Sequence, residues 1–305
     1  MTSGGPGPLV TVTDPADPRL ADYVDLADPP ARRRVERERS IMVVEGRVAV
    51  RRLLASHHRV RSLLVDDHQA ASADDLVAAT RRRGAPVFVG SREVVAATVG
   101  FALHRGVVAA ADRPEVLDPD EVVTRAAAAR GLGSGPPVVA VLEGLNDHEN
   151  IGALFRNAAA FGVAGVLLDP TCADPLYRRS IRVSAGHVLL VPFARLAPWP
   201  AAVDHLRGAG FLVAALAPGR SGPDGAGALT PEELASRVAG GRHRAGDPAS
   251  ARPAGVALVI GAEGPGLTPG LLARADVTVS IPMAADVDSL NAATAAAIAF
   301  HSLST

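Results

Sequence analysis

Residues 138–169, VVAVLEGLNDHENIGALFRNAAAFGVAGVLLD, decide the expected fold of the second half of the chain. The run VVAVLEGL predicts a buried strand, the next segment has apolar residues at helical spacing, and VAGVLLD predicts a second strand. Buried strands joined through a helix are typical of parallel pairing. The alternation continues, with further strands expected at 187–193, 211–217, 255–261 and 277–283. We therefore predict a doubly wound α/β domain over residues 138–305.

The preceding part of the chain predicts a smaller α/β domain, over residues 31–117. A helix is expected at 45–56 and a buried strand at 60–67. A second helix follows, with Ser72 as its N-cap and Gly84 as its stop. The segments PVFVG, SREVVAATVG and RGVVAAADR then predict a strand, a helix and a strand.

Three segments fall outside this regular pattern. Residues 1–30 carry five aspartates and only Arg19, and we expect a flexible acidic lead. Residues 118–137 hold a short Ala-rich helix between Gly- and Pro-containing stretches, which is typical of a linker between domains. Residues 218–254 are rich in Gly, Pro, Ala and Ser around one short helix, and we interpret them as a mobile surface insertion.

Composition excludes several classes of protein. No apolar run approaches the roughly 18 residues of a membrane span, and the first residues lack the pattern of a secretory leader, so we expect a soluble cytoplasmic protein without membrane contact. The one cysteine, Cys172, excludes an intrachain disulfide. It also cannot by itself build a zinc site, so we expect a buried thiol and no metal.

Basic charge is local. The net charge of -1 gives no overall support for nucleic-acid binding, yet residues 31–61 hold ten arginines against three glutamates, a net of +7. All 31 basic residues of the chain are arginine, whose planar side chain suits bidentate phosphate contacts. Taken alone, the run is also what a solvated protein face would look like.

Polar residues and glycines gather where predicted strands of the second half end. Asn150 begins the helix after the first strand and Arg156 lies inside it, although a helix cap and a surface arginine would look the same. Gly261 and Glu263 follow the strand at 255–261, in a turn that fits neither a dinucleotide fingerprint nor a phosphate loop. Ligands of open α/β sheets usually bind at this edge.

The last such segment, VTVSIPMAADVDSLNAATAAAIAFHSL at 277–303, is a strand, a loop and an Ala-rich helix that starts near Ser289. Asp288 or Ser289 is the expected cap of that helix. This interpretation leaves Asn291 unexplained, because asparagine is only moderately favourable just inside a helix.

Together and in this order, the three segments resemble the motifs of the SpoU/TrmH branch of the SPOUT RNA methyltransferases, over about residues 138–303. Residues 31–112 more loosely resemble that family's L30e-like substrate-binding domain. The resemblance implies a parallel sheet with a deep trefoil knot, a homodimer paired through the knotted domain, and S-adenosylmethionine (SAM) as cofactor. This sequence departs from the family pattern at one place. The first motif usually has a proline two residues before its asparagine, and His148 occupies that position here.

The resemblance also implies roles for individual residues. Backbone groups at Gly261, Ile281 and Leu290 would hold SAM. Arg156 would activate a ribose 2′-hydroxyl, with help from a phosphate of the target RNA. The remaining motif residues would orient the ribose and Arg156, hold the site's polar network or contact the substrate; they are Asn150, Asn291, Glu263 and Ser289.

Several functions stay open at this point. Structured RNA is the implied partner, and the separate N-terminal domain favours 23S rRNA over tRNA by analogy only. A catalytically silent RNA-binding protein, acting in assembly or antibiotic resistance, is the alternative from another class, but the complete motif set favours an enzyme. A nucleotide-binding dehydrogenase would need a Gly-rich turn after the strand at 138–145, where LEGLNDHEN stands instead.

Overall fold

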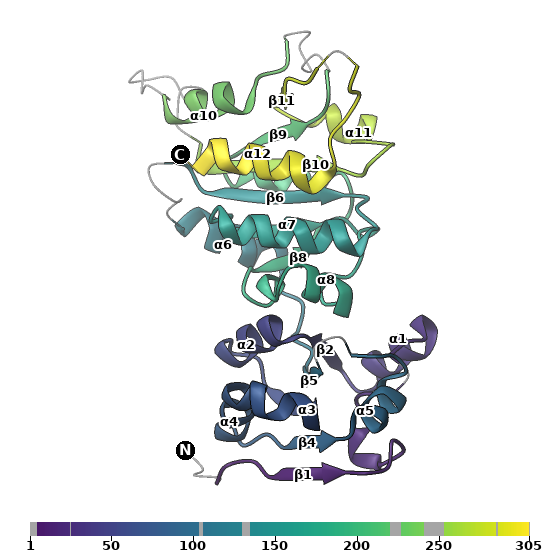
Figure 1. Ribbon diagram of the computed structural model, residues 1–305. Coiled ribbons are helices and arrows are strands. Elements are labelled where there is room, and N and C mark those ends of the chain that lie inside the picture. Colours follow the sequence, from purple (N-terminus) through teal and green to yellow (C-terminus); the bar gives the residue numbers. More distant parts are fainter. Residues whose placement is uncertain are drawn as a thin grey trace. The chain divides into compact units, whose positions relative to one another are not determined.

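A computed structural model describes residues 5–24, 26–103, 106–129, 135–219, 227–240, 253–284 and 286–304. The chain divides into two compact units, and each is described by itself (Figure 1). The N-terminal unit comprises Met1–Glu115 with Leu176–Leu190, and the C-terminal unit comprises Val116–Pro175 with Val191–Thr305. Among the described residues, every helix is too short or too polar to span a bilayer.

The N-terminal unit is built on a mixed five-stranded sheet. Its order is β1-β4-β3-β5-β2, in which β1, β4 and β3 run parallel while β5 pairs antiparallel with β3 and β2. The strands are β1(Leu9–Val12), β2(Ile41–Glu45), β3(Val60–Asp66), β4(Val87–Gly90) and β5(Val107–Asp112). The helices are η1(Pro18–Leu20), α1(Pro29–Glu38), α2(Arg47–Ala55), α3(Asp67–Ala70), η2(Ala71–Ala73), α4(Asp74–Arg82) and α5(Arg92–Val99).

The lead segment at 1–30 is not a flexible tail over its described part. β1 pairs with β4 from Leu9 opposite Val87 to Val12 opposite Gly90, so it forms an edge of the sheet. The segment after it buries Leu20, Tyr23 and Leu26 completely. The prediction was wrong here because its aspartates lie between apolar residues that pack into the core. Residues 1–4 and 25 lie outside the described part.

Two local predictions are also wrong in this unit. Ser72 does not cap the helix at 72–84, because α4 begins at Asp74 and the Ser72 hydroxyl instead donates to the Gln69 carbonyl at 3.0 Å. The strand expected at 187–193 is replaced by η3(His187–Leu189), which follows α8(Arg178–Val183). Gly186 between them has a φ of +86° and turns the chain after α8, and extended structure begins only at Phe193, with β8(Phe193–Arg195).

The C-terminal unit has an all-parallel six-stranded sheet of order β11-β9-β10-β6-β7-β8. Its strands are β6(Val138–Glu143), β7(Gly165–Leu168), β8(Phe193–Arg195), β9(Phe211–Leu216), β10(Gly255–Gly261) and β11(Val277–Val279). Its helices are α6(Pro119–Ala128), α7(His148–Ala160), α9(Val203–Gly208), α10(Pro231–Ala239), α11(Pro269–Leu272) and α12(Ala292–Ser304). The predicted parallel α/β architecture is therefore confirmed.

Helices cover both faces of this sheet. Figure 1 shows α7 and α12 running side by side across one face, and the two helices are in contact. On the other face, α6, α9 and α11 share one apolar core with alternate residues of the strands. The carboxyl ends of β6 and β10 therefore emerge next to the beginnings of α7 and α12.

The proposed linker and insertion are more closely packed than the sequence suggests. In the linker at 118–137, Val122, Val123 and Ala126 of α6 join the core, while residues 130–134 lie outside the described part. In the insertion at 218–254, α10 begins with a capping box between Thr230 and Glu233 and packs against α12. Residues 220–226 and 241–252 lie outside the described part.

Candidate active site

Three polar side chains from distant parts of the sequence meet at the carboxyl ends of β6 and β10. Asn150 comes from the first turn of α7, Glu263 follows β10, and Asn291 directly precedes α12. The Asn150 amide donates to Glu263 Oε1 at 3.1 Å. The Asn291 amide donates to the same oxygen at 2.5 Å and to Asn150 Oδ1 at 2.8 Å. We call these three residues the amide–carboxylate network.

The way in which α7 and α12 are capped leaves the side-chain N–H groups of both asparagines to donate to Glu263. Asp147 caps α7 by accepting from the Glu149 amide at 2.9 Å, so Asn150 is not the cap and its side chain is free to reach Glu263. At α12, Asn291 accepts from the backbone amides of Ala293 and Thr294 at 3.0 and 3.1 Å. The cap of this helix is therefore Asn291, and the prediction of Asp288 or Ser289 was wrong.

The loop after β10 turns back on itself through glycine. Ala262 pairs with Gly266, and Gly264 and Gly266 have φ values of +81° and +67°. A Cβ on Gly261 would lie 2.6 Å from the carbonyl carbon of Gly266, which is too close for any other residue without movement of the loop. The close turn carries Glu263 at its tip.

A buried carboxylate that the sequence analysis missed anchors this loop. Glu143, the last residue of β6, accepts from the Thr268 backbone amide at 2.8 Å and from the Thr268 hydroxyl at 2.7 Å. The Trp199 indole donates to it at 2.7 Å. The available signal was a glutamate at the end of a wholly apolar strand, where a carboxylate needs several donors to be buried.

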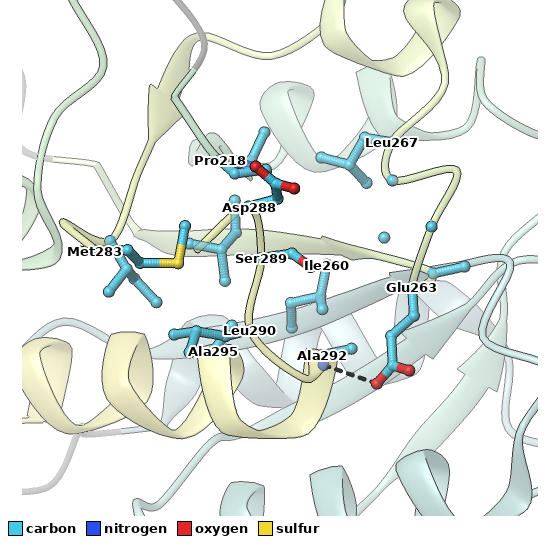
Figure 2. Close-up of a pocket in the computed structure, with 17 residues that line it drawn as sticks. Pro218, Ile260, Glu263, Leu267, Met283, Asp288, Ser289, Leu290, Ala292 and Ala295 are labelled. Carbon is cyan, nitrogen blue, oxygen red and sulfur yellow. Dashed lines mark hydrogen bonds between the residues drawn. The ribbon is translucent and has the colours of Figure 1, made fainter. Parts of the chain in front are cut away.

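A cavity of about 380 Å³ lies beside the network. Figure 2 shows it between the loop after β10, the segment between β11 and α12, and the first turn of α12. Its apolar lining comes from Leu216, Ile260, Leu267, Ile281, Met283 and Leu290, and its polar side chains are Glu263, Asp288 and Ser289. The volume lies in the range of small-molecule and cofactor sites.

Most of the site residues predicted from the sequence lie at or beside the cavity. Five of them line the cavity: Gly261, Glu263, Ile281, Ser289 and Leu290. Asn150 and Asn291 contact Glu263 from outside the lining.

Arg156 is not part of this group. It is exposed on α7, outside the lining, and has no hydrogen bond or ion pair with the described residues. Asn157, its neighbour, faces α12 instead and donates to the Ala293 carbonyl at 2.8 Å.

Two other predictions concern reactive groups. Cys172 is buried as expected, and burial raises the pKa of its thiol to about 12, so it is not a thiolate at neutral pH. Across the described residues, no three His, Cys, Asp or Glu side chains are grouped where they could hold a metal ion.

Comparisons with known proteins show the family to which the chain belongs. Residues 137–301 match the model of the SpoU rRNA Methylase family, and residues 43–117 match the model for RNA 2′-O ribose methyltransferase substrate binding. An uncharacterized tRNA/rRNA methyltransferase of Mycobacterium tuberculosis is 42% identical over 290 residues, which cover 95% of this chain and 90% of that protein.

Solved structures share the fold over nearly the whole chain. An AdoMet-bound rRNA methyltransferase from Sinorhizobium meliloti matches with a TM-score of 0.70 at 22% identity, covering 97% of each chain. A crystal structure of an RNA 2′-O ribose methyltransferase matches with a TM-score of 0.71 at 23% identity, covering 96% of this chain and 98% of that one. The resemblance seen in the sequence is confirmed, and the chain belongs to the SpoU rRNA methylase family as an RNA 2′-O-ribose methyltransferase.

Proposed function

We propose that this enzyme binds SAM in the cavity beside the amide–carboxylate network and methylates a ribose 2′-hydroxyl of 23S rRNA. The observation that carries the proposal is the convergence of Gly261, Ile281 and Leu290 on one cavity that Glu263 borders. These are the positions that the family motifs assign to the cofactor. The AdoMet bound to the Sinorhizobium meliloti relative supports the same choice.

The lining fits SAM by its chemistry. Most of it is apolar side chain and glycine backbone, which suits an adenosine moiety. Its charged side chains, among the described residues, are the carboxylates Glu263 and Asp288, with no arginine or histidine. Such a lining disfavours a phosphate-bearing cofactor and favours a cation. SAM would supply an electrophilic methyl group on a positively charged sulfur.

The chain's own residues then orient the acceptor. Asn150 and Asn291 fix the Glu263 carboxylate, and Ser289 is exposed at the cavity where it can contact the ribose. We assign Arg156 to the substrate hydroxyl and its phosphate. A guanidinium stays protonated in proteins, so Arg156 acts by orientation and charge, with a target phosphate helping to position it, and the hydroxyl proton leaves to solvent as the carbon–oxygen bond forms.

We further propose a homodimer through the outer face of α7 and α12. Arg156 and Ala160 on α7, and Thr294 and Ile298 on α12, are exposed on these two adjacent helices. Ile298 is one of the few large apolar side chains exposed in the described part. A second copy on this face would cover it and would bring Arg156 to a partner's surface. The trefoil knot also stays a proposal from the family resemblance.

RNA contact is proposed for the N-terminal unit. Several arginines of the run at 31–61 have carboxylate partners, but Arg33, Arg34 and Arg37 are exposed on α1 without an ion pair to any described residue. The three side chains lie on one side of the helix, because at about 100° per residue they fall within a sector of about 100° around its axis. Free guanidinium groups can contact phosphates of structured RNA.

The test is methyl transfer from labelled SAM to bulk rRNA and tRNA, followed by mapping of 2′-O-methyl sites in cells with and without the protein. We expect label in 23S rRNA, and label in tRNA alone would overturn the substrate choice. Arg156→Ala should abolish transfer and leave SAM affinity nearly unchanged. Absence of both transfer and SAM binding in the unaltered protein would refute the function.

A further inference from the structure

Asp288 is a cavity carboxylate without a partner among the residues that the structure describes. It lies in the segment between β11 and α12, is exposed, and has no hydrogen bond or ion pair with the described residues. It caps no helix, because Asn291 caps α12. A charged side chain that borders a cavity without stabilising the fold is available to whatever occupies that cavity.

The second carboxylate of the lining differs from it. Glu263 Oε1 accepts from the amides of Asn150 and Asn291 and from the backbone amide of Ala292 at 3.3 Å. Figure 2 shows Glu263 directed toward the start of α12, whereas Asp288 points away from it. Neutral donors therefore stabilise the charge of Glu263, while Asp288, which also lines the cavity, receives no such donor from the described residues.

This difference matters for a reaction that changes the cofactor's charge. Transfer of the methyl group breaks its bond to sulfur, leaves the electron pair on sulfur and joins carbon to the ribose oxygen, whose proton is released. The sulfonium thereby becomes a neutral thioether. Because the amino-acid ends of SAM and S-adenosylhomocysteine carry the same pair of opposite charges, the sulfur holds the only charge difference between them.

We propose that Asp288 makes the cavity discriminate between the two forms of the cofactor, binding SAM more tightly than S-adenosylhomocysteine. The inference rests on the proposed SAM site. A single carboxylate open to water exerts a moderate effect, because solvent screens the attraction. We expect Asp288→Asn to weaken SAM binding by roughly three- to tenfold and to leave S-adenosylhomocysteine binding within about twofold.

The experiment is calorimetric titration of the full chain with SAM, S-adenosylhomocysteine and sinefungin, whose amine replaces the sulfonium by another cation. Asp288→Asn should weaken SAM and sinefungin alike, and Asp288→Glu should restore most of the preference. Asp286→Asn is the matched control, since Asp286 is an exposed carboxylate of the same segment outside the lining. It should change none of the three affinities. Added salt should weaken SAM binding more in the unaltered protein than in Asp288→Asn.

Equal weakening of SAM and S-adenosylhomocysteine in Asp288→Asn would overturn the inference, because Asp288 would then contact a part that both ligands share. An unchanged SAM affinity would also overturn it. Either result leaves the proposed function intact. Failure of the unaltered protein to bind any of the three ligands would instead refute the cofactor site itself, and this inference with it.

Discussion

Two glutamates at strand ends show how differently this molecule uses a carboxylate. Glu45, the last residue of β2, is 8% exposed at its side chain and lies 2.6 Å from Arg178 and 3.5 Å from Arg182. Glu263, just after β10, is exposed, and within the described part of the chain its donors are neutral N–H groups. A carboxylate neutralised by arginine is closed to ligands, whereas one held by amides keeps its charge for a ligand.

The ion pairs of Glu45 with Arg178 and Arg182 hold the segment 176–190 on the N-terminal unit. Arg178 also lies over the Phe101 ring at 4.3 Å, and Arg32 lies over the Tyr177 ring at 3.9 Å while donating to its hydroxyl. Part of the arginine run that suggested RNA binding therefore serves the fold. We call Glu45 with Arg178 and Arg182 the Glu45 cluster.

Breaking the Glu45 cluster should give the largest effect. Glu45→Ala leaves Arg178, 16% exposed at its side chain, without its carboxylate, and we expect a loss of about 3 kcal/mol in the stability of the N-terminal unit. Hydrogen exchange of backbone amides in residues 176–190 should accelerate, while calorimetric SAM affinity stays the same. Unchanged exchange there would contradict a structural role for the cluster.

Arg182→Gln is the matched control for that variant. Arg182 is 47% exposed and only 3.5 Å from Glu45, so its removal should cost less than about 1 kcal/mol. A loss as large as that of Glu45→Ala would mean that Arg182, and not Arg178, is the main partner.

The contrast between the units also explains which parts of the fold the sequence could predict. Strands such as β10 are short apolar runs between helices, so the length of the run and the residues that flank it locate them. β1 was missed because LVTV is brief and lies in an acidic segment. The docking of 176–190 could not be predicted, since contacts such as Arg178 with Glu45 join residues 133 positions apart.

Asn291→Ser is expected to produce the next largest effect, in the open network. Serine caps a helix about as well as asparagine, so stability should change by less than about 0.5 kcal/mol. The donor to Glu263 and Asn150 is lost, and we expect kcat/KM for methyl transfer to fall roughly a hundredfold, about 2.7 kcal/mol. Asn291→Ala should lose the cap as well as activity. A fully active Asn291→Ser enzyme would contradict the role of the network.

Glu143→Gln tests the support beneath that network. Glutamine keeps one acceptor but turns an amide donor toward Thr268, whose backbone N–H already points there. We expect the free energy of unfolding of the C-terminal unit to fall by about 2 kcal/mol. Unfolding can be monitored by the fluorescence of Trp199, the one tryptophan of the chain. We also expect a weaker SAM affinity. Thr268→Ser keeps both donors and should be much milder. An equal effect of the two variants would argue that the threonine methyl, and not the carboxylate, anchors the loop.

The site was predictable only where chain direction determines it. Asn150, Glu263 and Asn291 follow strands that end at the same edge, so their convergence follows from the parallel sheet. Caps were misassigned because Asp147 and Asn150 are both good capping residues three positions apart. Asp288 was interpreted as a cap for the same reason, and its place in the cavity depends on how the chain turns between β11 and α12.

The smallest expected effect is a pH dependence of stability that comes from His58 in the N-terminal unit. His58 is 8% exposed and its Nε2 lies 3.1 Å from the Leu189 carbonyl, which is again a contact to the segment 176–190. Burial lowers the pKa of His58 below its ordinary value of 6.5, with Arg83 and His57 acting in the same direction against the carbonyl. The unfolded chain then binds the proton more readily than the folded one.

The sign follows from that difference in pKa. The stabilising contribution is complete well above pH 6.5 and declines as the pH falls through this value, by at most about 1.4 kcal/mol at pH 5.5. His58→Gln retains an amide donor for Leu189 and removes the titration, so urea unfolding at pH 5.5 and 7.5 should show a smaller difference for this variant than for the unaltered protein. An identical difference would assign the pH dependence to other groups. Higher stability at pH 5.5 than at pH 7.5 would mean that the Leu189 carbonyl raises the pKa of His58 more than burial lowers it. The contact would then stabilise a charged imidazolium, as the Glu45 cluster stabilises charged side chains.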